Sequence, residues 1–128
     1  MDIVVTLPKS FGLKRWIAEG DPAGAKWSGT EWGWFMGGSP PKKLQPGDRV
    51  YVVYSGHLIG YSPLIRIDDD PVCYDTNVPV YFKDSFALVR GGDAVAVTID
   101  QKIRGFQGYR YRWWDRSEER PFPEWQKL

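Results

Sequence analysis

The chain has 128 residues, which suits one domain with its own hydrophobic core and is short for two. With 42% hydrophobic and 26% charged residues, the composition argues against general disorder. The formal net charge is only +1, so binding to nucleic acid would have to come from local charge patterning.

Cysteine content and hydropathy exclude further classes of protein. Cys73 is the one cysteine, which rules out a disulfide framework within the chain. For the same reason we expect no zinc site with thiolate ligands. We expect no metal and no cofactor. No apolar run approaches the roughly 20 residues of a membrane span. The first residues lack a basic stretch, so we expect no signal peptide and a cytoplasmic protein without a membrane partner.

The N-terminal part predicts a strand, a helix and a second strand. β-Branched residues over 3–7 predict the first strand. Ser10 is expected to cap a helix over 11–18. The buried face of this helix has the spacing i, i+3 and i+4, at Leu13, Trp16 and Ile17. A loop rich in Gly and Pro covers 20–29, and the aromatic segment 30–36 is expected to be extended.

The remaining chain predicts short strands joined by turns. Pro46 and Gly47 predict a type II turn, and 68–71 predicts an acidic loop. Gly91, Gly92 and Asp93 predict a hairpin between the runs that flank them. Strands are predicted over 49–54, 58–67, 86–90, 94–99 and 109–114. Six or seven short strands with one early helix favour a mainly β (α+β) fold, a small and partly closed barrel.

The segment 102–116 combines basic and aromatic residues, with the sequence KIRGFQGYRYRWWDR. In a strand, alternation would place Arg110 and Arg112 on one face and their aromatic neighbours on the other. One face could then cover the core while guanidinium groups line a groove and hold phosphates. The alternative is a solvated edge strand. The candidate phosphate-binding residues are Arg104, Arg110 and Arg112.

A second cluster contains three tryptophans, Trp27, Trp32 and Trp34. Trp32 and Trp34 are two residues apart, so both would lie on one face of a strand. Such rings can stack on a planar base, or they can simply belong to the core. Trp27 lies in a Gly/Ser loop and is the better ligand candidate of the three. We expect rings and guanidinium groups to surround a single concavity.

Lys26, Glu31 and His57 are candidates for catalysis. Lys26 could hold a phosphate while Glu31 acts as a general base, or Glu31 could accept the amino group of a base. His57 follows a turn and is interpreted as a surface residue. The acidic run 68–70 is interpreted as a solvated turn rather than a cation site.

Three stretches resemble the PUA-like superfamily, in particular its ASCH and EVE branches. The stretch LQPGDRVYVVY at 44–54 is similar to a strand entry of the type hydrophobic-x-x-Gly-Asp-hydrophobic, and HLIGYSPL at 57–64 is similar to the barrel strand that follows it. Ahead of both, Gly24, Lys26 and Glu31 lie where ASCH domains carry a G-x-K-x-x-E-x-R motif.

This resemblance implies a PUA-like pseudo-barrel over residues 1–128, with a cleft beside the early helix. It also implies a partner such as RNA, DNA or a flipped and often modified base. The leading hypothesis is therefore a nucleic-acid-binding module. One alternative is an ASCH-type, metal-independent ribonuclease or nucleotide hydrolase that uses Lys26 and Glu31. Another is a protein-interaction domain with an aromatic surface.

Overall fold

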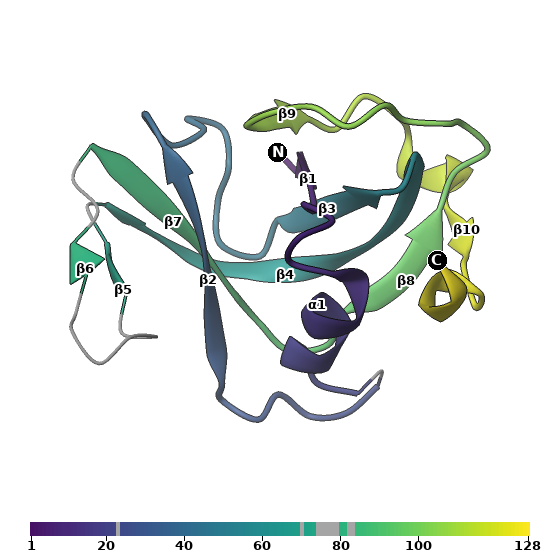
Figure 1. Ribbon diagram of the computed structural model, residues 1–128, viewed down its shortest axis with the longest axis horizontal. Coiled ribbons are helices and arrows are strands. Elements are labelled where there is room, and N and C mark those ends of the chain that lie inside the picture. The colour runs from purple at the N-terminus through teal and green to yellow at the C-terminus, as the bar shows by residue number, and fades with distance from the viewer. Residues whose placement is uncertain (23, 70, 74–79, 82–83) are drawn as a thin grey trace.

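Eight strands form one mixed sheet beside a short helix (Figure 1). The structure is a computed structural model that describes residues 1–22, 24–69, 71–73, 80–81 and 84–128. The elements are β1 (Ile3–Thr6), α1 (Leu13–Glu19), β2 (Glu31–Gly37), β3 (Arg49–Tyr54), β4 (His57–Asp69), β5 (Val72–Cys73), β6 (Val80–Tyr81), β7 (Ser85–Gly91), β8 (Val95–Thr98), β9 (Tyr109–Tyr111), η1 (Arg116–Glu118), β10 (Arg120–Pro121) and η2 (Trp125–Lys127). The expected mainly β class with an early helix is confirmed.

Strand β4, which is 13 residues long, divides the sheet into two wings. Its first half pairs with β3 on one edge and, at Gly60 and Tyr61, with β8 on the other. Its second half, from Leu64 onward, pairs with β7, whose far edge carries β2. Glycine is required at position 60, because a Cβ there would overlap the carbonyl oxygen of Val95 in β8. The first wing continues from β3 to β1 and β9.

The predicted hairpin around Gly91 to Asp93 is wrong. Strands β7 and β8 do not pair with each other, because each pairs with a different part of β4. Between them the chain turns toward the end of α1, where the Asp21 N–H donates to the Gly92 carbonyl at 3.0 Å. Gly92 adopts a φ of 89°, which favours glycine. The signal for a turn was correct, but the partner strand lies elsewhere in the chain.

Three further predicted boundaries differ from the structure. Helix α1 begins after Gly12 instead of Ser10, and no side-chain hydrogen bond caps its N-terminus. Asp68 and Asp69 belong to β4 rather than to an acidic loop, and Asp70 lies outside the described residues. The last long strand predicted at 109–114 ends at Tyr111. The type II turn is confirmed by Gly47, with a φ of 90°, and by a bond from the Asp48 N–H to the Gln45 carbonyl.

Strand alternation gives the first wing a core on each face. In β1, Ile3 and Val5 belong to the first core, whereas Val4 belongs to the second. In β9, Tyr109 and Tyr111 pack against the first core. Arg110 lies between them in the strand and opposite Val4 in the register, so it faces the side of the second core. Alternation along β9 therefore places Tyr109 and Tyr111 on one face of the sheet and Arg110 on the other.

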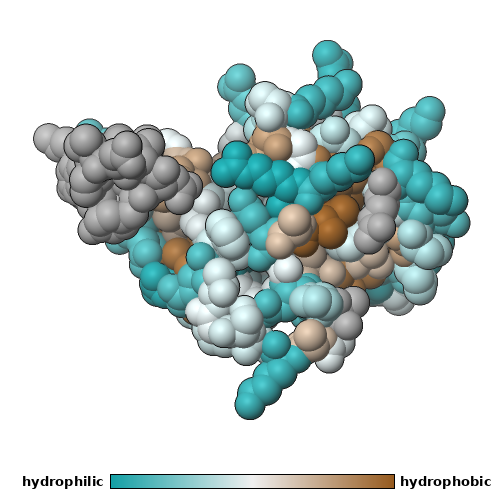
Figure 2. All heavy atoms as spheres, turned by 60° about the horizontal axis from the view of Figure 1, so that its bottom comes forward, coloured by the Kyte–Doolittle hydropathy of each residue, from teal (hydrophilic) through white to brown (hydrophobic). Residues whose placement is uncertain are grey.

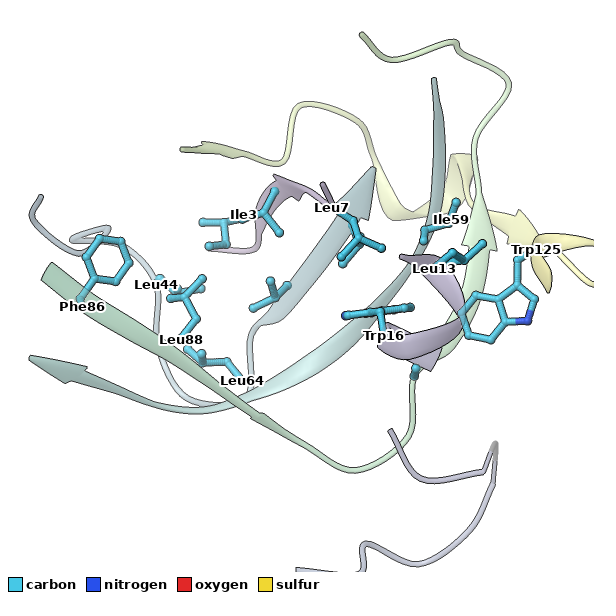
Figure 3. Close-up of a cluster of buried hydrophobic side chains, with 14 residues drawn as sticks. Ile3, Leu7, Leu13, Trp16, Leu44, Ile59, Leu64, Phe86, Leu88 and Trp125 are labelled. Carbon is cyan, nitrogen blue, oxygen red and sulfur yellow. The ribbon is translucent and has the colours of Figure 1, made fainter. Parts of the chain in front are cut away.

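The first core extends from β7 to the C-terminal segment (Figure 3). Phe86 and Leu88 lie at one end of the labelled band, and Trp16 of α1 and Trp125 of η2 lie at the other. Trp16 is only 1% exposed and meets Trp125 edge to face, with ring centroids 5.9 Å apart. The charged C-terminal tail is therefore packed onto the domain, and β10 pairs with β8.

Buried carboxylates join the two chain ends to the sheet. The Asp2 carboxylate, in a residue that is 4% exposed, accepts from the backbone N–H of Arg49 at 2.8 Å and from the guanidinium groups of Arg112 and Arg116. Glu119 accepts from Arg49, from the Tyr51 hydroxyl at 2.6 Å and from the Trp114 indole at 2.9 Å. Burial and the bond to Glu119 raise the pKa of Tyr51 above its ordinary value.

The charge on Asp2 is favoured in the folded state. Burial raises the pKa of its carboxyl group, but the hydrogen bonds from the Arg49 backbone and from the two guanidinium groups outweigh that effect. The pKa therefore lies below its ordinary value of 3.8. A group of this kind stabilises the fold above that pH, and its contribution is lost as the pH falls through the folded value.

Asp2→Asn should lower the free energy of unfolding by about 2 kcal/mol near neutral pH, because two guanidinium groups lose their anion. The difference between wild type and variant should shrink as the pH falls from 3.8 toward the lower pKa of the folded protein, because the unfolded chain takes up a proton before the folded Asp2 carboxylate does. Urea unfolding across this pH range measures both effects.

Asp100→Asn is the matched control, because Asp100 pairs with Arg120 on the surface and its side chain is 83% exposed. This change should alter stability by less than about 0.5 kcal/mol. Equal losses in the two variants, or a pH-independent difference for Asp2→Asn, would contradict the buried ion pair.

Candidate functional site

A cleft of about 1370 Å³ lies between the two wings of the sheet, beside α1. It is lined by the end of β1, by α1, by β2, β7 and β4, and by the loop residues 106–108. The view in Figure 2 shows hydrophobic atoms recessed between hydrophilic rims on one face of the molecule. A concave, largely apolar space of this size fits an organic ligand.

Strand β2 supplies the aromatic wall of the cleft. Its burial alternates, so that Trp32, Trp34 and Met36 are half-buried while the residues between them are exposed. Trp32 lies opposite Arg90 and Trp34 lies opposite Leu88 in the register with β7. Trp34 and Met36 also pack against the first core. Trp34 therefore belongs both to the core and to the cleft surface, whereas Trp32 lines the cleft.

Two indole N–H groups at the cleft lack an acceptor among the described residues. They belong to Trp16 and Trp32, which both line the cleft. Buried donors in native proteins usually have a partner, so each of these is an unsatisfied group, and both nitrogen atoms are themselves buried.

An ion-paired arginine lies on the β4 side of the cleft. Arg66 donates to Glu31 at 2.6 Å and to Asp68 at 2.9 Å, and these bonds raise the pKa of its guanidinium group further. Glu31 lines the cleft, but its carboxylate is bound to Arg66 and is not a free base in this arrangement. The three side chains together carry a net charge of about −1 at neutral pH.

A second charged cluster lies on the helix side. Arg90 is 6% exposed, and its Nη2 donates to the Trp16 carbonyl at 3.0 Å and to Glu19 at 3.1 Å. Burial lowers the pKa of Arg90, and Glu19 partly offsets this effect. Arg15 also pairs with Glu19, at 3.4 Å, and lies 4.4 Å from the centre of the Phe11 ring. Two cations share one carboxylate, so this cluster carries a net charge of about +1.

Lys26 and Trp27 do not line the cleft. Trp27 is 44% exposed, and its indole donates to the Thr30 carbonyl at 3.0 Å. The ring lies against Gly91, where a Cβ would be only 2.8 Å from its Nε1 atom. His57 begins β4 and lines neither the cleft nor the basic hollow described next.

Arg104 and Arg110 lie in a separate and smaller hollow, of about 410 Å³. Lys102 and the exposed ring of Trp113 line the same space, which we call the basic hollow. Among the described residues, none of these three cations forms an ion pair. Arg110 lies 4.4 Å from the centre of the Phe106 ring, which holds it in place.

Arg112 has a different role, because its guanidinium group pairs with Asp2 at 3.0 Å. The expected single concavity of tryptophans and arginines is therefore not what the structure shows. Trp32 and Trp34 line the cleft, whereas Arg104 and Arg110 line the basic hollow. The reason is the parity of β9, which turns Arg110 to the opposite side of the sheet from Tyr109 and Tyr111.

The cleft residues that the sequence interpretation missed include Phe11, Arg15, Trp16, Arg66 and Arg90. Trp16 was assigned to the core on its helical spacing, which is correct but incomplete. The sequence does contain a signal for Arg90. This arginine directly follows the apolar run Phe86 to Val89, and an arginine buried with such a run needs an anionic partner.

Comparisons with protein-family models, curated proteins and solved structures find no match to this chain. Within the described residues, no group of three or more His, Cys, Asp and Glu side chains is arranged to hold a metal ion. In the same part of the chain, none of the helices has the length and apolar character required to cross a membrane.

Proposed function

We propose that the chain is a cytoplasmic nucleic-acid-binding module of the PUA-like kind. In this proposal a base of RNA or DNA enters the aromatic cleft, and neighbouring phosphates meet the basic hollow. The observation that carries the proposal is the wall of half-buried tryptophans in a large cleft beside α1. A cleft in this position also supports the proposed pseudo-barrel. Its strands would follow the order β2-β7-β4-β3-β1-β9, and the cleft would lie at the gap between the two ends of this order.

The chemistry of the cleft suits a planar, polar ring. Stacking of a base on an aromatic side chain contributes about 1–3 kcal/mol and needs no particular base. Carboxylates at the rim, from Glu31 and Asp68, could accept an exocyclic amino group.

The loop 103–108 connects the cleft to the basic hollow. Phe106, Gln107 and Gly108 line the cleft, whereas Ile103, Arg104 and Gly105 line the basic hollow. A strand that leaves the cleft across this loop would therefore reach cations that form no ion pair within the described part of the chain. Arginine suits this contact because its guanidinium group binds phosphate oxygens in pairs.

Catalysis by Lys26 and Glu31 is less well supported than binding. The alternative requires the two residues to act on the same substrate, but Lys26 lies outside the cleft and Glu31 is neutralised by Arg66. The salt dependence of binding distinguishes a protein partner for the aromatic surface from nucleic acid. Affinity for nucleic acid falls steeply as the salt concentration rises, because phosphate contacts weaken.

Trp32→Leu or Trp34→Leu should weaken binding of a single-stranded 12-nucleotide probe by about 5- to 150-fold, since each removes a stacking surface. Fluorescence anisotropy of labelled RNA and DNA probes measures the affinity. Trp27→Leu is the control and should stay within about twofold of wild type. Wild-type affinity in both cleft variants would contradict the base site.

The double variant Arg104→Ala/Arg110→Ala should lose two phosphate contacts. The slope of log affinity against log salt concentration should fall by about 1.4 for a single strand. Lys42→Ala/Lys127→Ala removes the same charge from positions outside both hollows, and its slope should be unchanged. An equal fall in the two double variants would mean that the net charge, and not the basic hollow, governs binding.

A further inference from the structure

The positive cluster on the helix side of the cleft has unused hydrogen-bonding capacity. Among the described residues, Arg90 uses only its Nη2 atom in hydrogen bonds, and Arg15 approaches Glu19 through its Nε atom. Glu19 therefore neutralises one of the two charges. Within the described residues, no hydrogen bond is formed by the Nε and Nη1 atoms of Arg90 or by the Nη atoms of Arg15. Both arginines and Glu19 line the cleft.

The two arginines differ in rigidity. Arg90 is fixed by the Trp16 carbonyl, by Glu19 and by the Trp16 ring, whose centre is 4.9 Å from the guanidinium carbon. The side chain of Arg15 is 62% exposed and is oriented by stacking over Phe11. One cation is thus pre-organised at the wall, while the other can move toward a ligand.

The charges of the cleft are also segregated. The β4 side carries a net charge of about −1 from Glu31, Arg66 and Asp68, and Asp69 lines the cleft there as well. The helix side carries a net charge of about +1. A ligand with an anionic group therefore has one favourable orientation, with that group toward α1.

We propose that Arg15 and Arg90 form a phosphate subsite for the nucleotide whose base stacks on β2. The inference rests on the proposed function and adds to it the identity of the ligand, a phosphorylated nucleoside rather than a free base. The phosphate here belongs to the bound nucleotide itself, whereas the basic hollow serves its neighbours along the strand.

Calorimetric titration with the four ribonucleosides and their 5′- and 3′-monophosphates tests the subsite. Wild-type protein should bind at least one monophosphate about 10-fold more tightly than the matching nucleoside. Arg15→Gln should reduce that ratio to below about twofold and leave the nucleoside affinity within about twofold of wild type. Arg15 is mostly exposed, so its replacement should leave the fold intact.

Lys14→Gln is the matched control, because Lys14 is an exposed cation on the same helix and does not line the cleft. Its monophosphate preference should equal that of wild type. Equal affinity for monophosphates and nucleosides, equal loss in both control and Arg15 variants, or no binding by any of these ligands would overturn the subsite. In each of these cases oligonucleotide binding that depends on Trp32 would leave the proposed function standing, and its absence would remove both.

Discussion

The architecture depends on one long strand that pairs with different partners along its length. β4 pairs with β3 and β8 in its first half and with β7 in its second, with an irregularity in register between Leu64 and Arg66. The β7–β2 pair consequently diverges from the β1–β3–β9 wing (Figure 1). Helix α1 fills part of the space between the wings and packs Leu13 and Trp16 into the core. The remaining space is the cleft.

Alternation along the strands then determines the chemistry of each surface. The face of β2 that carries Trp32 and Trp34 meets the cleft, and Arg90 lies beside Trp32 in the adjacent strand. In β9 the same alternation directs Arg110 to the other side, toward the basic hollow. Buried carboxylates at Asp2 and Glu119 pair with Arg49, Arg112 and Arg116, whereas Arg104 and Arg110 form no ion pair among the described residues. The protein thus has a net charge of only +1 and still has a locally cationic surface.

Local features were predictable from the sequence, and long-range pairing was not. The strands at 49–54 and in the aromatic segment, the turn at Gly47 and the buried helix face all follow from short-range patterns. The pairing of β7 with β2 depends on contacts between residues that are 48 to 60 positions apart, such as Trp32 and Arg90, and no local pattern encodes them. For the same reason, the sequence predicts some of the cleft residues and misses others. Trp32, Trp34 and Glu31 carry a local signal, whereas Arg15 and Arg90 meet only through Glu19 in the folded chain. In the sequence, Arg112 has the same alternation as Arg110, and only the folded structure shows that Arg112 is paired with Asp2.

The central claim is that a nucleic-acid base occupies the cleft between α1 and β2. Ultraviolet crosslinking of the purified protein to single-stranded RNA and DNA, followed by identification of the modified peptides by mass spectrometry, tests it directly. The account predicts adducts within residues 31–37 of the cleft wall, together with adducts in the segment 102–114. Adducts confined to other surfaces, such as the loop around Trp27, or a complete absence of adducts, would contradict it.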